Sequence, residues 1–192
     1  MLPTSAFQHF ILEDITGELT GSEFIELDER MKYRVRCTIK EPKRTVYTIY
    51  NALDEARTPG RTAAGMSAIS LLEYGEKNSL GLVSYPATPC IPMKNYLVKT
   101  NNKGSSKLKQ RKFRASDGQE YCWCWRAYAD HEWTCYSSTG KQIAHYAMKP
   151  ECEPPYVGSS GSALVVEEAY PHLADEILTS LLIMRHIQKY NL

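Results

Sequence analysis

The C-terminal stretch from Asp175 to Ile187 constrains the fold more than any other part of the sequence. It begins with two acidic residues, continues with apolar residues on almost every side, and has Arg185 and His186 near its end. This order of charges matches the macrodipole of a helix. A surface helix has one apolar stripe, whereas a helix that is apolar all round is normally buried. We therefore expect a helix at about 172–189 that the rest of the chain encloses.

The chain before this helix is predicted to form short antiparallel strands. Residues 33–39 alternate apolar and polar side chains, as a half-buried strand does, and residues 45–50 form the hairpin partner. Residues 107–115 and 120–128 flank a Ser-Asp-Gly-Gln turn, which predicts a second hairpin. Further strands are expected at 66–74, 80–85, 96–99, 132–136, 142–148 and 162–167. The thirteen tyrosines also suit a β-rich chain.

These elements predict a mainly β (α+β) fold, a closed antiparallel β-barrel of about 10–12 strands around the buried C-terminal helix. The alternative is an open sheet with the helix on one face, which should leave a polar stripe on the helix. Only Thr179 and Ser180 could supply such a stripe, so the barrel is preferred. Residues 1–30 are expected to form an N-terminal arm or an extra edge element, and residues 31–192 a single barrel domain.

Composition and charge bear on the partners and the cellular compartment of the protein. The net charge is +1, so charge gives no signal for a nucleic-acid partner. No segment reaches the roughly 20 apolar residues of a membrane span, and residues 1–6 lack the charged and apolar regions of a secretory signal. We expect the six cysteines to be free thiols of a cytoplasmic protein. They are Cys37, Cys90, Cys122, Cys124, Cys135 and Cys152.

No metal site or cofactor is predicted. Cys122 and Cys124 share one face of a strand, with His131 and Cys135 nearby, but zinc sites usually have two to four residues between paired ligands. We therefore interpret these two cysteines as small side chains between strands. Tyr121, Trp123 and Trp125 lie on the other face, and the tryptophans are assigned to the core.

The candidate acid–base residues of the C-terminal half are Asp117, His131, Glu132 and His145. A carboxylate and a histidine of this set could serve a hydrolase or an isomerase. The competing interpretation is structural: Asp117 is a turn residue, and Glu132 lies on a solvated strand face. No recognisable spacing of nucleophile and base favours catalysis.

A basic stretch from Lys103 to Arg114 contains the candidate ligand-binding residues. On a strand, Lys107, Lys109 and Arg111 share one face with Phe113, so the cations could form a stripe that receives phosphates of a lipid headgroup or a nucleic acid. Charge runs are more often solvated faces of edge strands, where lysine prevents edge-to-edge pairing.

The C-terminal half also resembles an uncharacterised family found in mushroom-forming fungi, a domain of unknown function. The resemblance rests on Phe113 with Asp117-Gly118, Tyr121 and Trp123, and on Asp175-Glu176-Ile177 with Thr179; it covers about 33–190. It implies a tubby-like barrel, similar to the phospholipid scramblase and LURP-one groups, with the C-terminal helix threaded through it. Cys122 and Cys124, and an enlarged loop at 57–65, depart from the family pattern. The resemblance transfers no catalytic residue.

Two main functional hypotheses follow. The first is a cytoplasmic binding module whose partner is an anionic lipid headgroup, a small apolar molecule or a protein. The second is an enzyme of fungal secondary metabolism that uses acid–base residues at an open end of the barrel. A self-associating structural protein is a third reading. An open pocket with two convergent titratable groups would favour an enzyme.

Overall fold

The computed structural model describes residues 9–53, 67–100, 109–150, 152–154 and 156–192. The strands in these ranges are β1 (Phe10–Asp14), β2 (Glu23–Glu26), β3 (Lys32–Glu41), β4 (Arg44–Asn51), β5 (Ser67–Gly75), β6 (Leu80–Ser84), β7 (Ile91–Pro92), β8 (Val98–Lys99), β9 (Gln110–Arg114), β10 (Glu120–Trp125), β11 (His131–Ser137), β12 (Gln142–Ala147) and β13 (Ser162–Val166). The helices are α1 (Met93–Tyr96), α2 (Ala174–Tyr190) and the short 3-10 helices η3 (Glu76–Asn78) and η4 (Pro171–Leu173).

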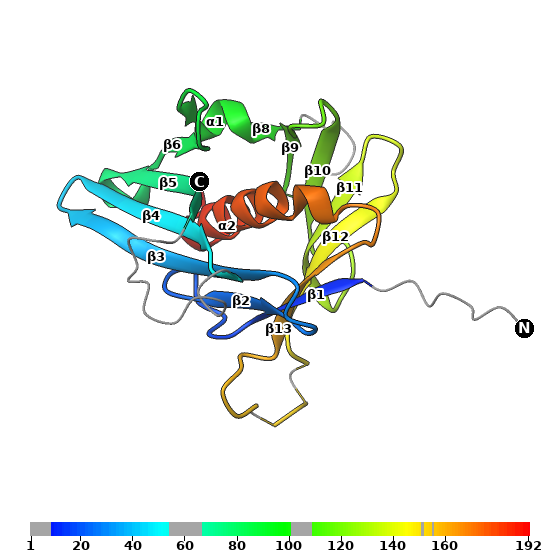
Figure 1. The fold of residues 1–192 in the computed structure, drawn as a ribbon. Helices are drawn as coiled ribbons and strands as arrows, with labels where there is room; N and C mark the ends of the chain where they lie inside the picture. Colours follow the sequence, from blue (N-terminus) through cyan, green and yellow to red (C-terminus); the bar gives the residue numbers. More distant parts are fainter. Residues whose placement is uncertain (1–8, 54–66, 101–108, 151, 155) are drawn as a thin grey trace, which may run out of the picture.

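All thirteen strands belong to one sheet in the order β7-β6-β5-β4-β3-β2-β1-β13-β12-β11-β10-β9-β8. Neighbouring strands are antiparallel, and most are joined by short connections along the chain. The predicted hairpins at 33–50 and 107–128 correspond to β3–β4 and β9–β10. Figure 1 shows the sheet curling around α2, with α1 and β8 beside the gap in the curve. The prediction of a mainly β chain with a C-terminal helix is confirmed.

The predicted closed barrel is wrong, because the two ends of the sheet do not pair with each other. The end strands β7 and β8 have two residues each, and α1 occupies the four residues between them. A helical turn does not present the extended backbone that a strand ladder needs, and Pro92 in β7 has no N–H to donate. The sheet is therefore an open one with a break between β7 and β8, at which α1 lies.

Helix α2 is buried on almost every side although the sheet is open. Its fully buried residues include Ile177, Leu178, Leu181, Ile183 and Met184. The two small polar residues at its centre are buried as well, and each has a partner on the sheet: Trp123 Nε1 donates to Ser180 Oγ at 2.9 Å, and the hydroxyls of Thr179 and Ser70 lie 2.8 Å apart. The alternative prediction of an open sheet expected a polar stripe on this helix. The two polar side chains are instead buried and hydrogen-bonded to the sheet. No helix in the described ranges is long and apolar enough to cross a bilayer.

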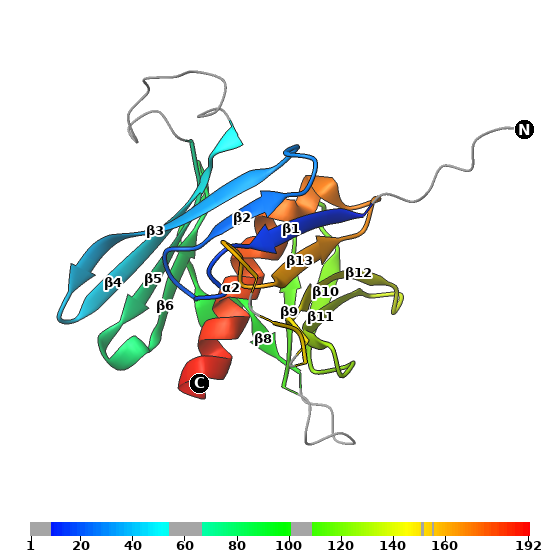
Figure 2. The same ribbon diagram turned by 90° about the horizontal axis from the view of Figure 1, so that it is seen from below.

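The described part of residues 1–30 contributes two strands to the interior of the strand order. β1 pairs with β2 on one side and with β13 on the other, and β2 continues to β3. Figure 2, the view from below, shows β1 and β13 side by side in front of α2. Leu12 and Phe24 point into the core and are fully buried. This segment is therefore placed between β3 and β13, and neither strand is an end of the sheet.

Candidate functional site

A hollow of about 680 Å³ lies at the N-terminal end of α2, and we call it the apolar hollow. One side is built by the start of β5, the residues that follow β6, β7 and α1; the other is built by the end of β9, η4 and the first turn of α2. It therefore lies beside the break in the sheet. Its wall is more apolar than polar, and the apolar part consists of Ala68, Ile69, Pro86, Ile91 and Ala115 with the rings of Tyr85 and Tyr96.

Two tyrosine hydroxyls meet in the wall of the apolar hollow. Tyr85 Oη and Tyr96 Oη are 2.7 Å apart and share a hydrogen bond. Burial raises the pKa of both phenols well above the ordinary value. Both groups therefore remain neutral hydroxyls at physiological pH. A hydroxyl accepts through two lone pairs and donates once, so the pair retains one donor and further acceptor sites for a polar partner.

The carboxylates of the apolar hollow are already engaged with neighbouring elements. Tyr33 Oη donates to Asp175 Oδ1 at 2.8 Å, which ties β3 to the start of α2. The main-chain N–H of Ser116 donates to Glu176 Oε2 at 2.9 Å, and the Ser116 hydroxyl donates to the same carboxylate. These bonds fix the first turn of α2 against the β9–β10 turn. They leave neither carboxylate poised as a free acid or base.

Two further polar side chains of the apolar hollow, Arg114 and His172, are not engaged in this way. Neither forms a hydrogen bond or an ion pair with another described residue. Both can therefore turn toward a bound molecule at little cost.

A second hollow of about 480 Å³ lies on the other side of α1, and we call it the cationic hollow. Lys94 of α1, Lys99 of β8 and Arg111 of β9 line it, together with Ser79, Leu80 and Leu192. No acidic side chain contributes to this wall. Arg111 is buried, with 6% of its surface exposed. Its guanidinium donates from Nη1 to Leu97 O at 3.1 Å and from Nη2 to Leu192 O at 3.2 Å.

The stripe of cations expected on the basic stretch does not take the predicted form in the described residues. Arg111 and Phe113 do share a face of β9, but both are buried, so this face is the inner one. Lys109 is exposed and donates from Nζ to Asn191 Oδ1 at 3.1 Å. Lys107 lies outside the described residues. The cations that gather around Arg111 are Lys94 and Lys99, which sequence reasoning did not single out.

The four acid–base candidates lie at three different places. Asp117 is in the β9–β10 turn, where it accepts from Gln119 N at 2.9 Å and from Tyr121 Oη at 2.6 Å. His131 and His145 come together on β11 and β12, with ring centroids 3.9 Å apart. Glu132 follows His131 in the chain, but its side chain reaches α2. The structure thus pairs two histidines and separates them from Asp117, which lies at the other end of β10. None of the four lines the apolar hollow.

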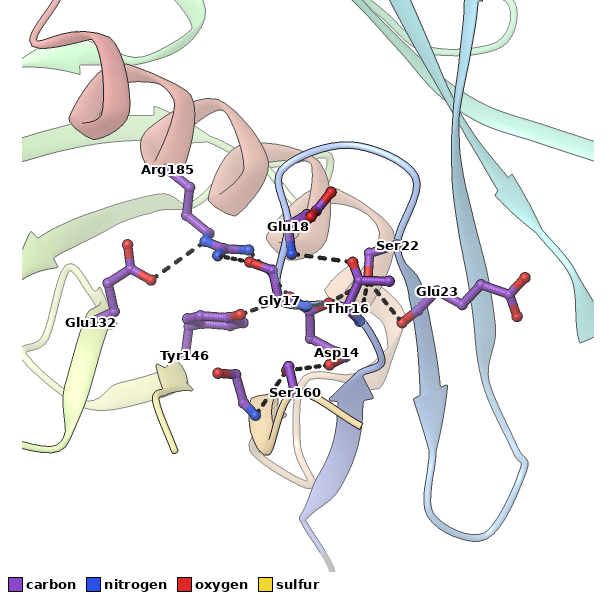
Figure 3. A network of polar contacts seen from close by, with 11 residues as sticks. Asp14, Thr16, Gly17, Glu18, Ser22, Glu23, Glu132, Tyr146, Ser160 and Arg185 are labelled. Carbon is purple, nitrogen blue, oxygen red and sulfur yellow. Dashed lines mark hydrogen bonds and ion pairs between the residues drawn. The ribbon is translucent and has the colours of Figure 1, made fainter. Parts of the chain in front are cut away.

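Glu132 belongs to a buried polar network around Asp14 and Arg185, drawn in Figure 3. Arg185 Nη1 lies 3.2 Å from Asp14 Oδ2, and Arg185 Nε lies 3.4 Å from Glu132 Oε2. Arg185 Nη2 also donates to Gly17 O at 2.8 Å, and Tyr146 Oη donates to Asp14 Oδ2 at 2.7 Å. The network joins β1, the loop after it, β11, β12 and α2.

A hollow of about 410 Å³ lies beside this network, lined by residues 17–20 with Glu132, Arg185, Gln188 and Lys189. Burial raises the pKa of Glu132, and the nearby Arg185 and Arg126 oppose that rise. A carboxyl with a raised pKa in a hollow can mark an active site, but structural ion-pair networks shift pKa values too. Because Arg185 already holds Asp14, Glu132 and Gly17, we assign this network to the architecture.

Sequence reasoning missed Asp14 and used Arg185 only as a helix-end charge. A signal for Asp14 exists, because it alternates with Leu12 on β1 and so occupies a core-facing position. A carboxylate at such a position needs a buried cationic or hydrogen-bonding partner. Arg185 supplies it, between the buried Met184 and His186 of α2. The pairing becomes visible only once β1 is recognised as an interior strand.

The cysteines Cys122 and Cys124 lie on the outer face of β10, opposite the side that carries the buried Trp123. Cys135 faces the interior from β11 and is fully buried. All six cysteines are free thiols in the structure. In the described part of the chain, no three His, Cys, Asp or Glu side chains form a group that could hold a metal ion.

Comparison with known proteins gave one match. A protein-family profile described as "Family of unknown function (DUF6593)" covers residues 22–190. The matched region includes both hollows beside α1 except Leu192, and it excludes β1 with Asp14. No curated protein and no solved structure matched the chain. The fungal origin and the tubby-like kinship implied by the sequence resemblance are not tested by this match.

Proposed function

We propose that this chain, which belongs to the family of unknown function DUF6593, is a binding module that holds a small, largely apolar molecule in the apolar hollow. The observation that carries the proposal is the hollow itself, with a volume of about 680 Å³ and a mainly apolar wall. Ligand sites in proteins typically have volumes of roughly 300–1,000 Å³, apolar linings and a few polar groups that fix orientation.

The polar groups of the hollow suit an apolar ligand with one polar end. The hydroxyls of Tyr85 and Tyr96 are neutral and buried, so they can bond a hydroxyl or carbonyl group without placing a charge beside it. Arg114 and His172 add donors that no described residue uses. We therefore infer a ligand with an apolar body and a hydrogen-bonding head.

The position of the hollow also supports binding. Its two sides come from opposite ends of the sheet, and α1 connects the end strands β7 and β8 along the chain. A molecule that fills the hollow would contact β5, β6 and β7 on one side and β9 and α2 on the other. It would thereby stabilise the sheet at its break, because ligand binding to the folded state adds to its stability.

Catalysis is the second hypothesis, and the contacts within the hollow favour binding over it. Asp175 and Glu176, the carboxylates of the hollow, already accept hydrogen bonds from Tyr33 and Ser116. The acid–base candidates Asp117, His131, Glu132 and His145 lie elsewhere. The six free cysteines support a reducing compartment, and we propose a cytoplasmic location on that basis.

Titration with Nile red, a neutral apolar dye, tests the proposal. We expect saturable fluorescence enhancement with one dye per chain. Ala68→Phe, which places a ring in the hollow, should weaken dye binding by about tenfold, equivalent to about 1.4 kcal/mol. The matched control is Ala147→Phe on β12, away from the hollow, which should bind the dye as the original chain does. Absence of saturable binding, or equal binding by Ala68→Phe, would reject the proposal.

Native mass spectrometry of the purified protein complements this test. A molecule carried through purification should appear as a discrete added mass that Ala68→Phe loses and Ala147→Phe keeps. Its identity would then define the polar head that the tyrosine pair receives.

A further inference from the structure

We infer that the cationic hollow is a binding site for a phosphate monoester, held by Arg111 together with Lys94 and Lys99. This site is separate from the apolar hollow and goes beyond the function proposed above. The two hollows share no lining residue and lie on either side of α1.

The first support is the way in which Arg111 is buried. Only 6% of its surface is exposed, and its guanidinium donates to Leu97 O and to Leu192 O, which in this chain belongs to the terminal carboxylate. No side-chain carboxylate among the described residues contacts it. Elsewhere in the structure a buried arginine has such partners, as Arg185 has Asp14 and Glu132. A buried charge is costly unless it is paired, and the carboxylate of Leu192 is the one anionic group among the lining residues. One carboxylate does not balance Arg111 together with Lys94 and Lys99, so the hollow keeps an excess of positive charge.

The second support is the presence of two lysines in the same hollow as Arg111. Lys94 and Lys99 line the same hollow, and neither forms an ion pair or a hydrogen bond with another described residue. Three cations thus converge on a space whose lining holds no acidic side chain and one carboxylate, that of Leu192. Like charges in one site repel each other, and an anion bound between them converts that repulsion into attraction.

The charge of the site selects among anions. A phosphate monoester carries about −1.5 to −2 at pH 7 and offers three acceptor oxygens, which matches three cations better than a single carboxylate does. Arginine adds planar donors suited to phosphate oxygens, and lysine adds mobile point charges. The volume of about 480 Å³ leaves room for a small organic group attached to the phosphate.

Arg111 is also placed to couple such a ligand to the fold. Its bond to Leu97 O fixes the residue between α1 and β8, at the break in the sheet. Lys94 and Lys99 belong to the same short segment. A phosphate bound by all three would bridge this segment to β9, and so would order the weakly paired end of the sheet.

Calorimetric titration with glycerol 3-phosphate tests the inference, with glycerol as the uncharged comparison. We expect saturable binding of the phosphate compound alone, weakened by added salt. Lys94→Gln/Lys99→Gln should weaken it by about tenfold or more. Lys40→Gln/Lys43→Gln removes the same charge from the exposed β3–β4 hairpin and should leave binding unchanged. Arg111→Gln should abolish binding, and the double-lysine variant keeps the test valid if Arg111→Gln does not fold.

A second arm separates a free phosphate compound from a lipid source. Phosphatidylcholine vesicles with and without phosphatidic acid are sedimented with the protein and both double-lysine variants. Sedimentation that depends on phosphatidic acid and is lost in Lys94→Gln/Lys99→Gln supports the site with a membrane as source. Binding of glycerol 3-phosphate without sedimentation supports it with a soluble ligand. No binding in either arm, or binding that the Lys94→Gln/Lys99→Gln change does not alter, overturns the inference while leaving the Nile red result unaffected.

Discussion

Asp14 and Arg185 form an ion pair that joins the first strand to the C-terminal helix, with Arg185 Nη1 3.2 Å from Asp14 Oδ2. The Asp14 carboxylate is fully buried and also accepts from Tyr146 Oη and from Gly17 N. A buried pair of this kind gains little over apolar packing, but breaking it leaves an uncompensated charge.

We therefore expect Arg185→Met to lower the free energy of unfolding by about 3–5 kcal/mol. Urea unfolding followed by tryptophan fluorescence measures this loss. The double variant Asp14→Asn/Arg185→Met should recover part of the loss, because it removes both charges. As the control, Arg44→Met breaks the exposed pair with Glu73 and should cost less than about 1 kcal/mol. A loss in Arg185→Met no larger than in this control would show that the network does not hold the fold.

The core position of α2 gives a second prediction. Leu181 is fully buried at the centre of the helix, so Leu181→Asp places a carboxylate where no cation or donor awaits it. We expect a loss of more than about 4 kcal/mol, seen as a missing cooperative unfolding transition. Lys189→Gln, in the exposed last turn of the same helix, should unfold as the original chain does. A folded, cooperative Leu181→Asp protein would contradict the burial of α2.

The sequence was sufficient to predict α2 and most strands because their periodicity is local. The run from Asp175 to Ile187 is apolar on all sides, which only burial explains. Closure of the sheet could not be predicted in this way. Closure depends on whether β7 and β8 pair with each other. Closing a sheet is generally favourable because it removes exposed edges. Here β7 and β8 have only two residues each, and Pro92 and the helical turn α1 between them prevent the pairing.

The candidate sites also combine features that local periodicity predicts with features that it does not. Alternation correctly placed Arg111 and Phe113 on one face of β9, but alternation alone does not say which face meets solvent. The presence of Phe113 indicated the inner face. Lys94 and Lys99 lie near Arg111 only because β8 pairs with β9, and that pairing joins segments across a stretch of undescribed residues. The apolar hollow likewise combines β5, β9 and α2, which no spacing in the sequence brings together.

The hydrogen bond between Trp123 and Ser180 gives a third prediction. Trp123 Nε1 donates to Ser180 Oγ at 2.9 Å, and both residues are fully buried. Ser180→Ala leaves the indole N–H without an acceptor, which should cost about 1–3 kcal/mol. Ser180→Cys, with a larger and weaker acceptor, offers a partial rescue. Urea unfolding measures both variants, and an unchanged free energy of unfolding in Ser180→Ala would mean that another acceptor serves Trp123.

The stacked histidines predict a dependence of stability on pH. Burial, followed by the charge of His131, lowers the pKa of His145 from 6.5 to about 4. Between these values the unfolded chain binds a proton that the folded chain does not, so stability should fall as the pH decreases from 6.5 toward 4. Above 6.5 this contribution should be constant.

Urea unfolding at several pH values between about 5 and 7 checks this slope, since most carboxylates remain ionised there. His145→Gln should flatten the slope, and His172→Gln, remote from the stacked pair, should leave it unchanged. An equal slope in His145→Gln and the original chain would assign the effect to another group.

The thiols of β10 give the last prediction, which concerns chemical reactivity. A hydrogen bond from Cys124 and the nearby Lys112 lower the pKa of Cys122, whereas the same hydrogen bond and burial raise the pKa of Cys124. Because the thiolate is the reactive form, Cys122 should react with iodoacetamide near neutral pH while Cys124, two positions along the strand, does not. Tandem mass spectrometry of the peptide that contains both residues distinguishes them.

Cys135, whose pKa burial raises, should react only after unfolding. In Cys122→Ser, Cys124 loses this partner but stays buried, and we expect it to remain unlabelled in the folded protein. Equal labelling of Cys122 and Cys124 in the folded chain would contradict the opposite directions of their pKa shifts.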